Sequence, residues 1–194
     1  MARHMLTNGH QVVISNSRGP ESLADVIAEL GDGAEAGTRD DVLKTDLVIL
    51  AVNWPDVPKA VEGATWNGKI LIDATNAHAE KPADFSPEGI AHSRAALGGR
   101  TSSEIVSEMT PGARLVKSIS NMPMGWIQDF SPHKPRTVFF TSGDDEQAKR
   151  VVIHLLDSLG FKALDLGSLA QGGVLHEVGA PLSGVDLDFV KGIR

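Results

Sequence analysis

The sequence contains no cysteine, which excludes both a disulfide framework and a metal site built on thiolates. No apolar run reaches the length of a membrane-spanning helix, and no secretory signal peptide is visible. The formal net charge of −7 disfavours nucleic acid and anionic membranes as partners. These absences predict a cytoplasmic protein, and 194 residues are enough for one domain with a full core.

Several motifs of catalysis and nucleotide binding are also absent. The chain has no G-x-G-x-x-G, no G-x-x-x-x-G-K-[ST], no H-E-x-x-H and no G-x-S-x-G. The histidines therefore predict neither a metal site nor a catalytic triad. We expect His154 to lie on the surface or in the packing of a helix, and His176 and Glu177 to lie in a solvated loop.

Strand-like and helix-like segments alternate along the chain. Short apolar runs predict strands at residues 12–14, 46–52, 69–73, 114–119, 137–141 and 162–166, with a weak edge strand at 34–37. Helices are expected at residues 1–8, from Pro20 with an apolar stripe of Leu23, Val26, Ile27 and Leu30, at 39–44, from 55, from the capping-box pattern at 101–104, and from 144. Residues 77–99 and the tail, 167–194, are expected to be irregular.

This alternation predicts an α/β fold, a Rossmann-like doubly wound and mainly parallel sheet in a single domain spanning residues 1–194. Ligands in such folds bind at the carboxyl ends of the strands. Polar strand ends are Ser15, Asn16, Ser17 and Arg18; Asn53 and Trp54; Ala74, Thr75 and Asn76; and Ser120, Asn121, Met122, Pro123 and Met124. We expect them to converge on one crevice, although each alone could be a simple turn former.

The first of these turns, residues 15–18, favours NADP over NAD. It offers hydroxyls and the guanidinium of Arg18, which match the geometry of the 2′-phosphate, and it has no acid to accept from a ribose hydroxyl. The alternative is a solvated loop arginine.

Five segments together resemble the NADP-dependent reductases of the deazaflavin coenzyme. They are Ser-Asn-Ser-Arg-Gly-Pro from residue 15, Leu-Ala-Val-Asn-Trp from 50, Leu-Ile-Asp-Ala-Thr-Asn from 71, Leu-Ala-Gln-Gly-Gly from 169 and Gly-Ala-Pro-Leu from 179. The resemblance implies hydride transfer between NADP and a planar redox partner such as deazaflavin or flavin, by a homodimer. Because the protein mainly positions the cofactor in such a transfer, no catalytic residue is predicted.

The resemblance also implies roles for the strand ends. Ser17 and Arg18 would bind the 2′-phosphate, and Val52, Asn53 and Trp54 would lie along the dinucleotide. Residues 74–76 would lie towards the nicotinamide. Residues 120–124 would border the deazaflavin, although family members often have a histidine where Ser120 stands.

The chain begins inside the helix that should follow the family's glycine loop. We therefore expect a first strand and a glycine-rich loop to be missing, through a mis-assigned start or a shortened polypeptide. Such a chain would be unstable and would bind NADP weakly. Its strands at 12–14 and 46–52 would either leave a gap or pair directly. A non-catalytic binding protein that kept the fold is the alternative function.

Overall fold

The structure, a computed structural model, describes residues 1–78, 84–122 and 136–189. The chain divides into two compact units, Met1–Val48 and Ile49–Arg194, with the boundary inside strand β3 (Leu47–Leu50). Each unit is described here by itself. The expected single domain stays a prediction.

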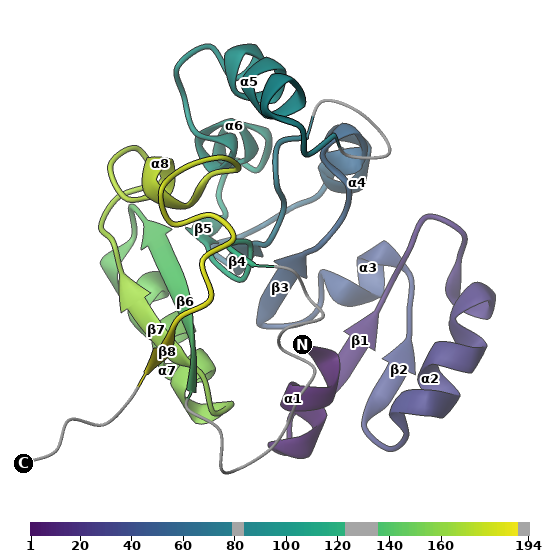
Figure 1. Cartoon of the computed structure of the whole chain (residues 1–194). Coiled ribbons are helices and arrows are strands. Elements are labelled where there is room, and N and C mark those ends of the chain that lie inside the picture. Colours follow the sequence, from purple (N-terminus) through teal and green to yellow (C-terminus); the bar gives the residue numbers. More distant parts are fainter. Residues whose placement is uncertain (79–83, 123–135, 190–194) are drawn as a thin grey trace, which may run out of the picture. The chain divides into compact units, whose positions relative to one another are not determined.

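Unit 1 is a small α/β unit built on two parallel strands (Figure 1). Its elements are α1 (Ala2–Thr7), β1 (Val12–Ile14), the 3-10 helix η1 (Pro20–Leu23), α2 (Ala24–Leu30), β2 (Ala34–Ala36) and α3 (Arg39–Val42). Val12 lies opposite Ala34 in the register of β1 and β2. The predicted edge strand at 34–37 is therefore present, and it pairs with the strand that precedes the polar turn.

The helix after that turn differs from its prediction. Its first turn, η1, is a 3-10 helix with Pro20 at its start, and α2 follows as a separate α-helix. Leu23 is buried, but α2 has no buried residue and Val26 is 41% exposed. The expected apolar stripe is present in part, because Ile27 and Leu30 are half-buried on the same side as Leu23, whereas Val26 faces solvent.

Unit 2 contains a larger sheet and most of the helices. Its helices are η2 (Trp54–Asp56), α4 (Val57–Val61), α5 (Pro87–Ala96), α6 (Ser102–Met109), α7 (Glu146–Ser158) and α8 (Gly173–His176). Its strands are β4 (Ile70–Asp73), β5 (Arg114–Lys117), β6 (Arg136–Gly143), β7 (Lys162–Asp165) and β8 (Asp188–Phe189). The strand order is β3-β4-β5-β6-β7, and β8 pairs with β6.

The expected α/β fold with a mainly parallel sheet is confirmed. Strands β4 and β5 are parallel, as are β6 and β7. The exceptions are β6, which is antiparallel to β5, and β8, which is antiparallel to β6. Strands β1 and β3 belong to different sheets, so the direct pairing considered above is not what the described residues form.

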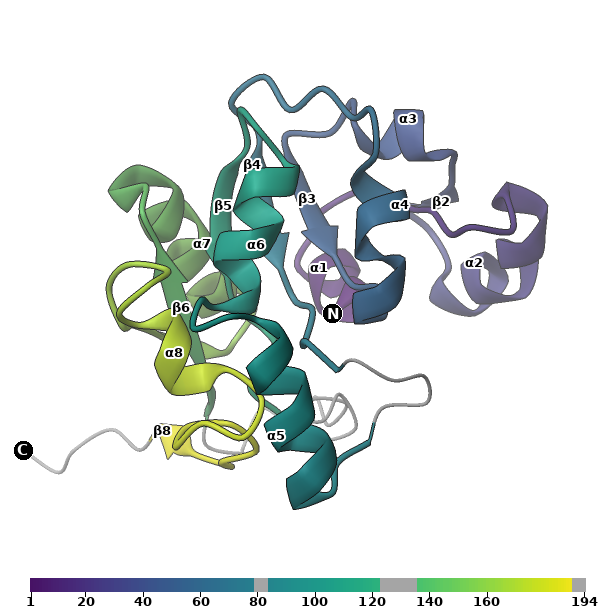
Figure 2. The same ribbon diagram turned by 90° about the horizontal axis from the view of Figure 1, so that it is seen from above.

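Helices cover the sheet of unit 2 on both faces (Figure 2). Helix α7 packs against β5, β6 and β7, whereas α6 contacts β5 and α8 contacts β6 from the other face. The core between these layers includes Leu71, Val116 and Phe139, none of which is exposed. All four residues of β4 are buried, as expected for a strand covered on both sides.

Two segments expected to be irregular contain regular structure. Helix α5 lies within 77–99, and its N-cap Ser86 accepts a hydrogen bond from the Gly89 amide. The C-terminal segment contains α8 and β8. Both predictions were wrong because these elements are short or weakly amphipathic, and packing against the rest of unit 2 supplies what the local pattern lacks.

In the part of the chain that the structure describes, every helix is too short or too polar to cross a membrane.

Candidate functional site

The turn after β1 is held by its own side chains. The Asn16 carboxamide accepts from the Arg18 amide at 2.8 Å and donates to Ser22 Oγ at 2.9 Å. Ser22 Oγ in turn donates to the Gly19 carbonyl at 2.7 Å. With the backbone held in this way, the side chains of Ser17 and Arg18 are exposed to solvent. Ser15 and Asn16 are half-buried.

The same turn contains a carboxylate that the sequence argument did not weigh. Gly19 has φ +93°, a left-handed conformation that glycine adopts without strain. A Cβ at this position would lie 3.1 Å from Glu21 Oε2. Glu21 therefore places a carboxylate against Gly19, the residue next to Arg18, and it bears on the choice between a phosphate and a ribose hydroxyl.

Three strand ends of unit 2 are joined by hydrogen bonds. The Ala74 amide donates to the Leu50 carbonyl at 3.0 Å, which links the loop after β4 to β3. The Asn76 carboxamide donates to the Ser120 carbonyl at 3.0 Å, which links the same loop to the segment after β5. The predicted neighbours 74–76 and 120 thus lie together.

The predicted residues after β3 and β4 differ in exposure. Val52 and Asn53 are exposed, and Trp54 is half-buried at the start of η2. Thr75 is buried, whereas Ala74 and Asn76 are half-buried. Residues 52–54 therefore present an accessible surface, and 74–76 a partly accessible one.

The segment after β5 is buried. Ser120, Asn121 and Met122 are 6%, 1% and 7% exposed, and Pro123 and Met124 lie outside the described residues. Ile119 has φ +65°, which is strained for a β-branched residue. Ser120 Oγ and both polar atoms of the Asn121 side chain are buried without a partner among the described residues. Such atoms normally carry a cost unless water or a ligand satisfies them.

Lys117, the last residue of β5, is fully buried in a polar cluster. Its Nζ donates to the Thr75 carbonyl at 3.3 Å and to Ser102 Oγ at 3.1 Å, and it lies 3.6 Å from Glu177 Oε1. Glu177 Oε1 also accepts from the amide and the hydroxyl of Ser102, at 2.9 and 2.6 Å. A buried ammonium is thereby paired with a carboxylate at the N-terminus of α6, where the helix dipole favours negative charge.

A second buried carboxylate completes this cluster. Asp73 Oδ1 accepts from the amide and the hydroxyl of Thr75, at 2.9 and 2.7 Å. Its Oδ2 accepts from Ser103 Oγ. Thr75 is therefore held from both sides, by Asp73 through its amide and hydroxyl and by Lys117 through its carbonyl.

The expectation of a solvated His176–Glu177 pair is wrong. His176 is fully buried, with Nε2 2.9 Å from Ser142 Oγ and its ring near Phe140. Burial, and to a smaller extent the nearby positive charge of Lys117, lowers the pKa of His176 to about 3, so the imidazole is neutral. His154, by contrast, is exposed on α7, as expected.

Sequence reasoning missed this cluster because its members come from distant segments. One signal was available: Lys117 directly follows the apolar Leu115 and Val116 in a strand expected to be buried, and a buried lysine requires a counter-charge. The capping box at Thr101 and Glu104 was recognised and is confirmed, but it does not reveal that Ser102 and Ser103 face carboxylates.

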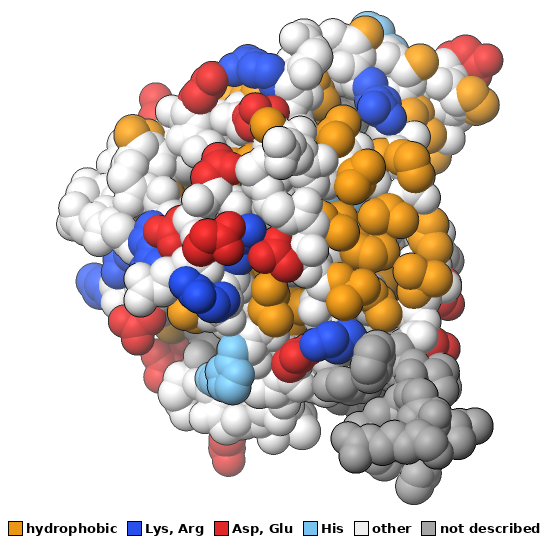
Figure 3. Space-filling model, turned by 90° about the vertical axis from the view of Figure 1, so that its left-hand side faces the viewer, with side chains coloured by type: hydrophobic (Ala, Val, Ile, Leu, Met, Phe, Trp, Pro, Cys, Tyr) orange, Lys and Arg blue, Asp and Glu red, His pale blue; other side chains and the backbone are white. Residues whose placement is uncertain are grey.

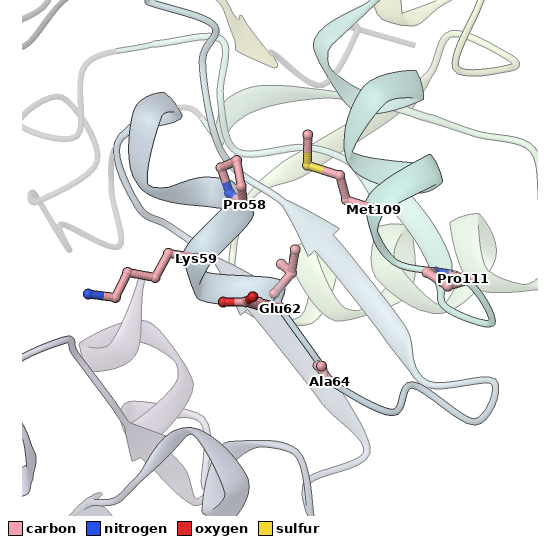
Figure 4. A pocket seen from close by; sticks show the side chains of 8 residues that line it. Pro58, Lys59, Glu62, Ala64, Met109 and Pro111 are labelled. Atoms are coloured by element: carbon pink, nitrogen blue, oxygen red, sulfur yellow. The ribbon is translucent and has the colours of Figure 1, made fainter.

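A cavity of about 580 Å³ lies elsewhere on unit 2, between α4 and the end of α6 (Figure 4). It is lined by Pro58, Lys59, Val61, Glu62, Gly63, Ala64, Met109 and Pro111. Residues 62–64 follow α4 and precede β4, and residues 109–111 lie at the end of α6 and precede β5, so this cavity lies at the opposite edge from the polar strand ends. It contains none of the predicted site residues.

Solved structures with the same fold include two of appreciable sequence similarity. A hypothetical protein from Sinorhizobium meliloti, SMa0349, is 35% identical, with a TM-score of 0.85 over 97% of this chain and 89% of that one. A candidate F420-dependent NADP-reductase from Arthrobacter sp. FB24 is 25% identical, with a TM-score of 0.69 over 87% of this chain and 79% of that one. A reductive aminase from Aspergillus terreus in complex with NADPH, at 18% identity and a TM-score of 0.58 over 90% of this chain and 53% of that one, shares the fold.

Curated proteins and family comparisons agree with this grouping. Metalloreductase STEAP3 of Rattus norvegicus is 24% identical over 173 residues, which make up 88% of this chain and 32% of that protein. This chain therefore spans about a third of the length of that relative. Residues 1–77 match the family described as NADP oxidoreductase, coenzyme F420-dependent. The chain belongs to this family, whose members are NAD(P)-dependent oxidoreductases.

Proposed function

We propose that the protein transfers hydride between NADP(H) and a planar redox partner, a deazaflavin or a flavin. The proposal depends mainly on one observation: the Asn76 side chain donates a hydrogen bond to the Ser120 carbonyl and so connects the 74–76 loop to the segment after β5. It unites two strand ends in a fold whose ligands bind at strand carboxyl ends.

The preference for NADP is supported by the turn after β1. Its exposed Ser17 hydroxyl and Arg18 guanidinium are free to donate to a 2′-phosphate, and a guanidinium binds such a group through charge-assisted hydrogen bonds. Glu21 is the group that would oppose this preference. The family match covers residues 1–77 and includes the whole turn.

The planar partner is supported by the segment after β5. The polar atoms of Ser120 and Asn121 have no partner among the described residues, and the carbonyl and amide groups of a deazaflavin or flavin ring could satisfy them. Met122 lies beside them and is adaptable in shape. Because these side chains are buried, the segment has to open before a ring can contact them.

The cofactor supplies the hydride, and the protein holds the nicotinamide ring and the acceptor ring next to each other. In this proposal the 74–76 loop orients the nicotinamide half, while Val52, Asn53 and Trp54 line the path of the dinucleotide. No side chain needs to donate or accept a proton for hydride to move between two bound rings.

The proposal is tested by following NADPH oxidation with a panel of planar acceptors, namely a deazaflavin, a flavin and a quinone. We expect turnover with at least one acceptor, and faster turnover with NADPH than with NADH. A protein that binds NADPH but reduces no planar acceptor contradicts the proposal, and the non-catalytic binding protein then becomes the better description.

Variants of Arg18 test the cofactor assignment within the same assay. Arg18→Ala should weaken NADPH binding by about tenfold or more and leave NADH binding nearly unchanged, because a charge-assisted hydrogen bond contributes about 1.5–3 kcal/mol. Arg150→Ala, which removes an exposed arginine from α7, is the matched control and should change neither. Equal losses for both cofactors in Arg18→Ala would refute the phosphate role.

We also propose that the protein forms a homodimer through a face of unit 2. Val174, Leu175 and Leu187 of the C-terminal segment are 40%, 39% and 40% exposed, which is high for large apolar side chains. Figure 3 shows one side of the molecule, and hydrophobic side chains gather in one area of that surface.

A further inference from the structure

Lys117 makes a polar contact in the candidate site, and no sequence motif predicts this contact. Its ammonium, fully buried, donates to the main-chain carbonyl of Thr75, which lies between two residues of the predicted nicotinamide loop. Asp73 holds the amide and hydroxyl of the same residue. The peptide groups on both sides of Thr75 are thus fixed by charged side chains.

The charge of Lys117 is balanced from a distant part of the chain. Glu177 follows α8 and reaches back to Lys117 and to Ser102 at the start of α6. Its neighbour His176 contacts Ser142, the residue opposite Lys117 in the register of β5 and β6. The consecutive residues His176 and Glu177 therefore contact Ser142 and Lys117, which lie opposite each other in β6 and β5.

We propose that Lys117 is a positioning residue for the cofactor loop, with Glu177 as its counter-ion. It holds the Thr75 carbonyl so that Asn76 can bridge to Ser120, which makes the C-terminal segment a part of the site. This role rests on the proposed function, because it assumes that residues 74–76 border the nicotinamide.

The variant that tests this role removes both charges together. Removing one partner alone would leave the other charge buried and unpaired, and such a change can unfold a protein without revealing its role. Lys117→Met/Glu177→Gln leaves neither charge and nearly conserves volume, and the glutamine oxygen can still accept from Ser102. Lys117→Gln/Glu177→Gln is the second variant, for use if the first does not fold.

Lys149→Met is the matched control. Lys149 is also a buried lysine, with Nζ 2.7 Å from Glu146 Oε1 and 3.1 Å from Asp165 Oδ1. It lies on α7, against the opposite face of the sheet, and within the described residues its ammonium is held by Glu146, Asp165 and the Gly167 carbonyl rather than by residues 73–76. A general loss of stability should affect both lysine variants, whereas a loss of loop position should affect the Lys117 variants alone.

Four measurements are made on the full chain: the melting temperature, the dissociation constant for NADPH, kcat/KM for NADPH and amide hydrogen exchange at residues 74–78. We expect the Lys117 variant to melt close to the control, to exchange faster at 74–78 and to bind NADPH more weakly, by up to about tenfold, because binding then has to order a loop that the Lys117 hydrogen bond no longer holds. The kcat/KM for NADPH should fall in parallel. Lys149→Met should match the unmodified protein in binding and in exchange at 74–78.

Unchanged NADPH binding in a folded Lys117 variant would overturn the positioning role. So would an equal loss of binding in Lys149→Met. If the unmodified protein does not bind NADPH, the proposed function fails on its own. The exchange at residues 74–78 then still decides whether Lys117 orders the loop.

Discussion

At the scale of single residues, the buried imidazole of His176 couples folding to pH. Its pKa is lowered to about 3 by burial and by the positive charge of Lys117, whereas an unfolded histidine titrates near 6.5. Between these values the unfolded state binds the proton and the native state does not. The native state therefore loses stability as the pH falls through this window, by up to about 1.4 kcal/mol for each pH unit.

We predict that His176→Gln flattens this dependence. A glutamine can keep the hydrogen bond to Ser142 and does not titrate, so the stability difference between the two proteins should narrow by about 2 kcal/mol from pH 7 to pH 5. Urea unfolding at the two pH values measures it. His154→Gln, at an exposed position of α7, is the control for replacing an imidazole by an amide outside the core. Parallel curves for His176→Gln would show that folding does not lower the pKa of His176.

At the scale of elements, α7 begins at a residue that also binds a neighbouring strand. Asp145 is the N-cap of α7 and accepts from the Ala148 amide at 2.8 Å. Arg114, at the start of β5, donates to both Asp145 oxygens, at 2.7 and 3.0 Å. The guanidinium and the helix amide hold the pKa of Asp145 well below its usual range. One side chain thus connects the start of a helix to the start of a strand.

We predict that Asp145→Ala and Asp145→Asn separate these two contributions. The alanine variant loses the cap and the ion pair and should cost about 1–2 kcal/mol of unfolding free energy. The asparagine variant keeps a good N-cap and weakens only a partly exposed ion pair, so it should cost less than about 1 kcal/mol. Urea unfolding at pH 7 compares them. Equal costs would mean that the cap contributes nothing.

At the scale of the whole molecule, the two units differ in how much core they contain. In unit 1, α2 and α3 have no buried residue, and all three residues of β1 are half-buried. Unit 2 contains the larger sheet, including the fully buried β4, and helix α7, with its buried Ala148, Val152 and Leu156. The NADP-binding turn of the proposal thus lies in the unit with the smaller core.

We predict that the protein in solution has twice the 20.6 kDa mass of one chain. Association would cover the exposed apolar side chains of the C-terminal segment. Light scattering after size-exclusion chromatography measures the mass. Val174→Asp/Leu187→Asp should yield a monomer, because each introduced charge would have to be buried. Val26→Asp, which changes a similarly exposed valine of α2, should leave the mass unchanged. A monomeric unmodified protein would refute the dimer.

Much of the local structure could be predicted from the sequence. The strands of β1, β3, β4, β5 and β7 coincide with the apolar runs, and Thr101 and Glu104 form the predicted capping box. The order of elements and the strand ends of the candidate site followed from the same patterns. Short-range patterns suffice here because apolar periodicity and helix caps act over a few residues.

The tertiary structure alone decided which distant residues share the buried polar cluster. The members of this cluster are separated along the chain by as many as 104 residues: Asp73, Ser102, Lys117 and Glu177. The sequence around each of them does not predict which residue it contacts. The tail that looked irregular closes over β5 and β6 because a buried lysine requires a carboxylate that no nearby residue supplies. No short segment of the sequence predicts that β6 runs antiparallel to β5, or that β1 and β2 form a separate sheet. Strand pairing depends instead on how the whole chain buries its apolar faces.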